Sequence, residues 1–429
     1  MSESLIARRE RLMGPNVPTF YRSPVHIVRG EGVWLWDAAG KRYLDCYNNV
    51  AHVGHCHPRV VAAIAAQAAV LNTHTRYLHD LVLDYIEQLT ATLGHGLSQA
   101  IMVCSGSEAN DIAIRMAQAV TGKTGIIATD NTYHGNTALV SQLSTRRVPI
   151  GGYANWVRLV PSPDTLRPLG GSRAGQGAVF AGHVKAAIAD LEAVGIGFAG
   201  MLVCPVFANE GLPDLAEGFM APVAAAVRAA GGLLIADEVQ PGFGRTGSDF
   251  WGHARMRFAP DVVSMGKPMA NGHPVAAVVA RPDVMAAFRT AFGYFNTFGG
   301  NPVSAAACLA VLQVIREEGL QENAARTSAY LLERLRALRH PLLANVRGVG
   351  QFYGVEFVAP DGVTPATGLV ADLVEAMVAK GFLLNKIGRG GNVLKIRPPM
   401  PFTTEHADLL AEALAEALAE APAEVAVGR

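Results

Sequence analysis

Between residues 100 and 280, short runs of apolar residues alternate with stretches that have helical spacing, and this alternation restricts the fold more than any other feature. Each run has the length of a β-strand, is apolar throughout and is bounded by glycine, proline or polar residues. Strands buried on both faces have this pattern, and helices between them favour a mostly parallel sheet. The runs are Ala100–Cys104, Gly125–Thr129, Gly200–Pro205, Leu233–Asp237, Asp261–Met265 and Val275–Ala280, and helices fit Asp111–Val120 and Met220–Ala230. We therefore expect an α/β fold.

The two ends of the chain lack this alternation and indicate a second, smaller domain. The first sixty residues are irregular, with short strand-like runs between turns. Towards the other end we expect a long helical stretch at 303–338, strands at Arg347–Phe357 and Leu394–Arg397, and a helix at Thr404–Glu420. We accordingly predict an N-terminal segment, 1–60, that packs with the small domain, a large domain, 61–315, and a small α+β domain, 316–429.

Charge and cysteine content exclude several classes of function. The 429 residues contain 36 Lys and Arg against 36 Asp and Glu, so no overall basic field exists to hold nucleic acid or an anionic membrane. The five cysteines are odd in number and scattered, so we expect reduced thiols in a cytoplasmic protein. The first residues lack the apolar core of a signal peptide, and the apolar stretches are too short to span a bilayer.

Chemistry is expected at the carboxyl ends of the strands, because ligands of open α/β sheets bind there. After the first run comes Ser105–Asn110, which includes Gly106 and Ser107 and leads into a helix. Small residues at a helix N-terminus leave backbone N–H groups pointing at one spot, which suits a phosphate. The alternative is an ordinary serine N-cap.

Two further strand ends carry an acid and a lysine. Asp237 ends one buried strand, where a carboxylate is costly unless it meets a positive partner such as a pyridinium nitrogen. Lys267 follows another strand between Gly266 and Pro268, where an ε-amine can be desolvated and form a Schiff base. Taken singly, they are also explained as a solvated loop acid and a surface lysine. Together with the phosphate cradle they supply the three contacts that pyridoxal phosphate needs, and Tyr133 adds an aromatic ring to stack on the cofactor.

Other motifs do not carry comparable weight. Gly122–Thr124 resembles the end of a P-loop but follows a helix, so Gly122 is interpreted as a helix stop. His52, His55, Cys56 and His57 suggest a zinc site only weakly, because no distant partner cluster is evident, and we expect no metal.

The motifs in their order resemble the class III aminotransferase family of fold-type I pyridoxal phosphate enzymes. The resemblance covers nearly the whole chain and rests on five segments: Ser105–Asn110, Tyr133–Gly135, Asp237–Gly247, Gly266–Lys267 and Thr297–Pro302. It implies a mostly parallel, seven-stranded type of sheet with helices on both faces and a smaller α+β domain.

The resemblance also implies roles for individual residues. Lys267 would hold the cofactor as a Schiff base and shuttle the proton, and Asp237 would keep the pyridine nitrogen protonated. Tyr133 would stack on one ring face with Val239 on the other, and Gln240 would contact the ring hydroxyl. The remaining cofactor contacts would come from Ser105, Gly106, Ser107, His134 and Thr297. Thr297 would reach the phosphate of the neighbouring subunit, since family members are homodimers with shared active sites.

A narrower likeness points to a branch of this family. The segments Tyr21–Pro24, Asn48–Pro58 and Asn72–Asp80 are similar to ethanolamine-phosphate and phosphohydroxylysine phospho-lyases, which catalyse β-elimination. Many transaminases of the family carry a Glu-Pro pair where this chain has Cys204-Pro205. That glutamate can pair with an arginine that binds the substrate carboxylate. Its absence weakens the case for an amino-acid transaminase, although Glu210 or another acid could substitute.

Several residues are candidates to bind the anionic end of a small amine substrate. They are Tyr21, Arg22, Asn48, Arg76, Lys395 and Arg397, of which we favour Arg76 and Arg397. Bidentate arginines suit phosphate and carboxylate equally, and each is alternatively a surface or domain-bridging ion pair.

Three functions follow from these observations. The first is a pyridoxal phosphate lyase that removes an α-proton from a small amino-alcohol phosphate or aminoalkylphosphonate and releases ammonia and an aldehyde. The alternative is an ω-transaminase that moves an amino group between a primary amine and a 2-oxo acid or aldehyde. The third, a catalytically idle scaffold, is disfavoured because nothing structural demands a lysine at residue 267.

Overall fold

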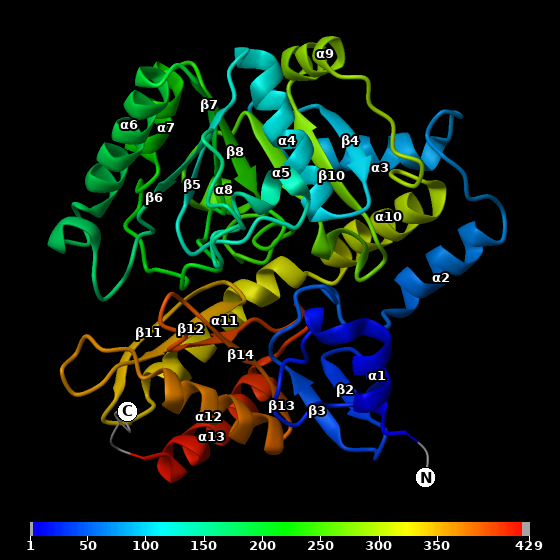
Figure 1. The fold of residues 1–429 in the computed structure, drawn as a ribbon. Helices are drawn as coiled ribbons and strands as arrows, with labels where there is room; N and C mark the ends of the chain where they lie inside the picture. The colour runs from blue at the N-terminus through cyan, green and yellow to red at the C-terminus, as the bar shows by residue number, and fades with distance from the viewer. Residues whose placement is uncertain (1–2, 423–429) are drawn as a thin grey trace.

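A computed structural model describes residues 3–422 and contains three sheets (Figure 1). The large sheet has the order β4 (Gln99–Val103), β10 (Ala276–Ala280), β9 (Val262–Met265), β8 (Leu233–Asp237), β7 (Phe198–Val203), β5 (Gly125–Thr129) and β6 (Val157–Val160). Only β10 runs antiparallel to its neighbours, and the remaining pairs from β9 to β6 are parallel. Because β10 opposes both β4 and β9, those two strands share one direction. The predicted mostly parallel sheet is thus confirmed.

Helices cover both faces of the large sheet, as predicted. Alternate strand residues enter two separate cores, because successive side chains of a strand point to opposite faces. One core contains α4 (Gly106–Thr121) and α9 (Pro282–Ala291). The other contains α2 (Pro58–Ala68), α3 (Asp80–Thr90), α6 (Gln176–Ala193), α7 (Ala221–Ala229) and α10 (Pro302–Glu317). The short helices α5 (Ala138–Ser141) and α8 (Gly252–Arg255) lie in loops.

The smaller domain is built from both ends of the chain (Figure 1). Its antiparallel sheet has the order β11 (Leu343–Val349), β12 (Phe352–Phe357), β15 (Val393–Ile396) and β14 (Asn385–Ile387), with α11 (Leu320–Arg336), α12 (Thr367–Ala379) and α13 (Thr404–Glu420). The N-terminal elements are α1 (Leu5–Met13), β1 (Ile27–Glu31), β2 (Trp34–Asp37) and β3 (Arg42–Asp45). β3 pairs in parallel with β13 (Phe382–Leu383), so one sheet joins the first sixty residues to the C-terminal part. The predicted domain limits stay a prediction.

Two sequence-based expectations were wrong in detail. The expected helical stretch 303–338 is two helices, α10 and α11, because Gly319 adopts a left-handed φ of +59° between them. α10 packs in the large-domain core, and α11 runs from that core, at Leu320 and Ala324, into the small-domain core, at Leu331 and Leu335. The expected strand Arg347–Phe357 is a hairpin, β11 and β12, that turns at Gly350 with a φ of +52°. No helix within residues 3–422 is both long and apolar enough to cross a membrane.

Candidate active site

A cavity of about 160 Å³ lies at the carboxyl ends of β4, β5, β8 and β9. These strands run in one direction, so the loops that follow them meet at one edge of the sheet. The cavity is lined by Gly106, Ser107, Tyr133, His134, Gly135, Asp237, Val239, Gln240 and Lys267. The structure therefore brings together most of the cofactor-binding residues that the sequence singled out.

The N-terminus of α4 forms one wall of this cavity. Ser105 is its N-cap and accepts a hydrogen bond from the Glu108 N–H at 3.3 Å, so the N-cap interpretation holds as well. A side chain on Gly106 would come within 3.0 Å of Val239, and one on Gly135 within 2.7 Å of the Ser107 hydroxyl. The two glycines thus let the walls approach closely while the helix N-terminus stays open to an anion.

Asp237 lines the cavity, and its carboxylate accepts hydrogen bonds from three donors. Oδ2 accepts from His134 Nδ1 at 2.6 Å and Asn110 Nδ2 at 3.1 Å, and Oδ1 accepts from the Val239 N–H at 3.0 Å. The Ser264 hydroxyl in turn donates to Asn110 Oδ1. These bonds hold the carboxylate in one orientation beside the cavity.

Sequence reasoning missed Asn110 and Ser264 as supports of this acid. A polar residue within a buried segment is the signal that identifies such supports. Asn110 on α4 and Ser264 within the apolar strand β9 are both fully buried. A buried polar side chain in such a position requires a hydrogen-bond partner.

Lys267 reaches the cavity from the short 3₁₀ turn that follows β9. Burial lowers the pKa of its amine, and the charge of Asp237 partly opposes this shift. An amine with a lowered pKa has a larger neutral fraction, which is the form that attacks an aldehyde. The backbone at Lys267 has a φ of +24°, a conformation that is rare outside glycine and that clusters at functional sites.

Two buried cations on β15 and at its end, Lys395 and Arg397, form a basic wall beside Gln240. Lys395 Nζ donates to the Ala208 carbonyl at 2.9 Å and to Gln240 Oε1 at 3.3 Å. Arg397 donates to Gln240 Oε1 and, through Nε and Nη2, to the Tyr47 carbonyl at 3.1 and 3.0 Å. Within residues 3–422 neither cation forms an ion pair with a carboxylate. Burial lowers the pKa of both side chains.

Glu210, the acid that could substitute for the family glutamate replaced here by Cys204, contacts other groups. Cys204 is buried directly after β7, and burial raises the pKa of its thiol. Glu210 is also buried, and its carboxylate accepts from the Thr129 hydroxyl at 2.7 Å and the Asn209 N–H at 3.1 Å. Burial raises the pKa of Glu210. In the described part of the structure Glu210 forms no ion pair or hydrogen bond with Arg397, so the hypothesis that the two residues pair is not supported.

The other predicted site residues lie outside the cavity lining. Asn48 donates its side-chain amide to Asp45, and Tyr21 is half-buried, with its pKa raised by burial and by Asp45. Arg22 is on the surface in an ion pair with Asp372 at 2.8 Å, which matches the alternative interpretation of that arginine.

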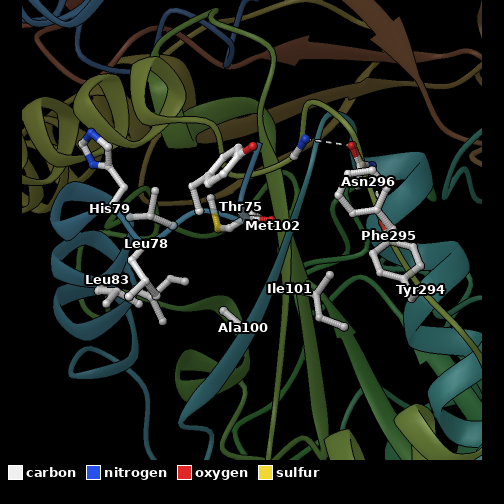
Figure 2. Close-up of a pocket in the computed structure, with 14 residues that line it drawn as sticks. Thr75, Leu78, His79, Leu83, Ala100, Ile101, Met102, Tyr294, Phe295 and Asn296 are labelled. Atoms are coloured by element: carbon white, nitrogen blue, oxygen red, sulfur yellow. Dashed lines mark hydrogen bonds between the residues drawn. The ribbon is translucent and has the colours of Figure 1, made fainter. Parts of the chain in front are cut away.

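Arg76 and Thr297 are exposed in the single chain. The Arg76 guanidinium stacks 3.8 Å from the centre of the Phe295 ring. Thr297 lies within the loop that the hydrogen bond from the Gly299 N–H to Asn296 Oδ1, at 2.7 Å, closes (Figure 2).

The histidines of the weak zinc motif bind separate partners. His52 contacts the Phe243 carbonyl, His55 the Asp45 carboxylate and His57 the Glu318 carboxylate. In the described part of the chain, no three His, Cys, Asp or Glu side chains gather as metal ligands would.

The residues present fit pyridoxal phosphate. The helix N-terminus at Gly106 and Ser107 suits its phosphate, Asp237 its ring nitrogen and Lys267 its aldehyde, and Tyr133 and Val239 flank the space between them. The fit depends on the close approach that Gly106 and Gly135 allow.

Comparisons with known proteins agree with this geometry. The model of the family "Aminotransferase class-III" matches residues 18–418. An alanine–glyoxylate aminotransferase 2-like protein of Drosophila melanogaster is 41% identical, covering 94% of this chain and 84% of that protein. The ethanolamine-phosphate phospho-lyase homolog 1 of Caenorhabditis elegans is 36% identical, covering 93% of this chain and 90% of that protein.

A solved structure is also similar over the whole chain. A phospholyase from Arthrobacter in complex with phosphoethanolamine is 44% identical, with a TM-score of 0.93 and coverage of 98% of this chain and 100% of that one. The chain therefore belongs to the class III aminotransferase family and is a pyridoxal-phosphate-dependent enzyme of fold type I.

Proposed function

We propose that the protein is a lyase that acts on a small amino-alcohol phosphate or aminoalkylphosphonate by β-elimination. After the α-proton is removed, the group on the β-carbon leaves, as phosphate from the ester or as hydroxide from a hydroxylated phosphonate, and water then releases ammonia and an aldehyde. The observation that carries this proposal is the basic wall, Lys395 and Arg397, neither of which forms an ion pair with a carboxylate among residues 3–422. Two buried cations without an acid are costly, and an incoming anion offsets that cost. The 44% identity to a phospholyase that was solved with phosphoethanolamine supports the same substrate class.

The charge of the substrate anion decides whether phosphate or carboxylate matches the basic wall better. A phosphate monoester carries a charge of about −1.5 to −2 at pH 7, whereas a carboxylate carries −1. Two buried cations that form no ion pair match the former better. In the transaminases of the family a glutamate can neutralise the arginine, but here Cys204 occupies that position and Glu210 contacts Thr129 instead.

The remaining residues would act around the substrate amine. When bound, pyridoxal phosphate acts as an electron sink for the carbon next to the amine. Lys267 Nζ would accept the α-proton, and Asp237 would hold a proton on the ring nitrogen. Tyr133 and Val239, which line the cavity, would hold the cofactor ring between them.

The ω-transaminase remains the second candidate. The 41% identity to an alanine–glyoxylate aminotransferase 2-like protein favours it. It shares the cofactor and the roles of Lys267 and Asp237, and differs in needing a second substrate, a 2-oxo acid or an aldehyde, to regain the starting cofactor.

We expect the purified holoenzyme to release ammonia and an aldehyde from phosphoethanolamine or a hydroxylated aminoalkylphosphonate without any added acceptor. Coupled assays for ammonia and aldehyde would measure equal amounts of both. 3-Amino-2-hydroxypropanoate replaces the phosphonate of a hydroxylated aminoethylphosphonate by a carboxylate and keeps the hydroxyl that leaves, so it is the matched control. It should react at least about tenfold more slowly, since one charge-assisted contact is lost. Turnover that needs a 2-oxo acid and yields no ammonia would establish the transaminase instead.

We also propose a homodimer with shared active sites. Large apolar side chains are strongly exposed on one face, with Leu78 at 97%, Phe298 at 71% and Tyr77 at 66%. They adjoin a pocket of about 300 Å³ in which Leu78 and Phe295 lie on opposite sides of β4 (Figure 2). Arg76 and Thr297 are on the same face, which supports contacts from both to the site of a second copy.

A charge on this face should separate the subunits. The double variant Leu78→Asp and Phe298→Asp is expected to raise the dimer dissociation constant at least about 100-fold. Both wild-type side chains would be buried in the proposed interface, and the variant would place a charge there instead. Sedimentation velocity at several concentrations measures this shift. Val363→Asp, which alters an apolar residue that is 58% exposed in the small domain, is the control and should leave the assembly unchanged. A wild-type protein that sediments as a monomer would refute the dimer.

The location in the cell stays a prediction. All five cysteines are free thiols, which supports a reducing compartment such as the cytoplasm.

A further inference from the structure

A fully buried carboxylate, that of Asp45, lies at the end of β3 and organises the loop that follows. Its Oδ1 accepts from the backbone N–H groups of Tyr47 at 3.0 Å and Asn48 at 2.9 Å. Its Oδ2 accepts from the Asn48 side-chain amide at 3.1 Å and from His55 Nε2 at 2.7 Å. Four hydrogen bonds on one carboxylate fix both the turn and the direction of the Asn48 side chain.

The turn that Asp45 builds is bonded directly to Arg397. The Tyr47 carbonyl accepts from two guanidinium nitrogens of Arg397, and the Cys46 carbonyl accepts from the Arg397 backbone N–H at 2.7 Å. The guanidinium also lies 5.2 Å from the centre of the Tyr47 ring. The loop therefore decides which of the guanidinium N–H groups face Tyr47 and which remain directed towards Gln240.

Asp45 is also the acid that faces the buried arginines of this region. Arg245 is completely buried and donates to the Pro398 carbonyl and to His52, so its bonded partners are neutral acceptors. Burial lowers the pKa of both Arg245 and Arg397, and the charge of Asp45 opposes that shift at each. Asp45 makes no direct contact with either guanidinium, and Arg397 Nη1 donates to the neutral Gln240 Oε1, with which an anion would compete.

We propose that Asp45 is a positioning residue for substrate recognition: through the Tyr47 carbonyl it aims the Arg397 guanidinium at the phosphate or phosphonate end of the substrate. This inference rests on the proposed function, because it takes the basic wall as the anion receptor. It adds that the receptor is assembled across the two ends of the chain, residues 45–47 from one and residue 397 from the other.

The chain contains a matched control for a purely structural turn. Asp37, at the end of β2, accepts from the N–H groups of Ala39 and Lys41, each at 2.9 Å, and from the Tyr43 hydroxyl at 3.0 Å. It builds a similar carboxylate-capped turn in the same sheet, but the turn has no contact with Arg397. If Asp45 acted only as a turn former, Asp37→Ala and Asp45→Ala would have similar consequences.

The test measures binding of inorganic phosphate to the holoenzyme by titration calorimetry, with cofactor absorbance and the melting temperature as checks of an intact protein. Asp45→Ala should weaken phosphate binding about 10- to 100-fold, the effect of losing a network of charge-assisted bonds. Asp45→Asn, which keeps an acceptor for the two backbone N–H groups, should weaken it less. Asp37→Ala should stay within about twofold of wild type, the span expected for a remote site.

Steady-state kinetics with the accepted phosphoamine supply a second readout. The Asp45 variants should raise KM by a similar factor while kcat changes much less, since the chemistry at Lys267 is untouched. If Asp45→Ala fails to fold, Asp45→Asn decides alone. Phosphate affinity and KM within about twofold of wild type in a folded Asp45 variant, or an equal loss in Asp37→Ala, would overturn the inference.

An Arg397→Met variant separates this inference from the function on which it rests. If Arg397→Met abolishes phosphate binding while the Asp45 variants do not weaken it, the anion receptor stands and only the role of Asp45 is refuted. If wild type binds no phosphate and Arg397→Met changes neither binding nor KM, the receptor itself is refuted, and the role of Asp45 with it.

Discussion

Replacing Lys267 by alanine is expected to lower turnover at least about 10⁴-fold, the largest effect of any single substitution in this protein. The variant loses both the amine that bonds to the cofactor aldehyde and the base beside the α-proton. No other group that lines the cavity can replace it, because the remaining lining side chains are hydroxyl, imidazole, amide, carboxylate and aliphatic groups.

The control for this experiment is a second buried lysine. Lys395→Ala removes an amine from the neighbouring basic wall but leaves Lys267 in place. Borohydride reduction followed by peptide mapping should find the cofactor on residue 267 in wild type and in Lys395→Ala, and on no residue in Lys267→Ala. A cofactor that maps to another lysine in wild type would contradict the proposed site.

Replacing Asp237 by asparagine is expected to lower kcat about 10²- to 10³-fold, which is typical of losing one preorganised electrostatic contact. The negative charge of Asp237 that would face the cofactor ring nitrogen disappears. The nitrogen would therefore hold its proton less firmly, and the ring would withdraw electrons less effectively. The introduced amide would still accept from the Val239 N–H through its oxygen, while its NH₂ group would face the former donors Asn110 and His134.

The neighbouring acid supplies the matched control. Glu238 is equally buried and accepts from the Gly252 N–H and from both the backbone and the ring of His253, but it does not line the cavity. Glu238→Gln should therefore lower the melting temperature while kcat changes less than about tenfold. A pH titration of cofactor absorbance should show a lowered pKa of the ring nitrogen only in Asp237→Asn. An unchanged titration in that variant would remove Asp237 from its proposed role.

Much of this site follows from local sequence because parallel strands align their carboxyl ends. The apolar runs before Ser105, Tyr133, Asp237 and Lys267 identify the strands, and the fold then gathers the residues behind them. The order of the sheet does not follow in this way. β10 is apolar throughout like the others, yet it alone runs antiparallel, and nothing in its residues distinguishes it.

Charge compensation depends on partners distant in the chain. The sequence contains Glu210 and Arg397, but only the folded chain directs Glu210 to Thr129 and joins Arg397 to Tyr47, 350 positions away. Asp45, whose carboxylate holds the loop beside Arg397, has no motif of its own.

By itself, the sequence determined the α/β architecture and the residues available for cofactor chemistry, because strand periodicity and strand-end polarity are local properties. Only the tertiary structure decided that two cations beside Gln240 have no ion-paired acid among the described residues and that the N-terminal loop contacts one of them. Electrostatic energy and hydrogen bonding depend on distances through space, and those distances are set when both ends of the chain pack together.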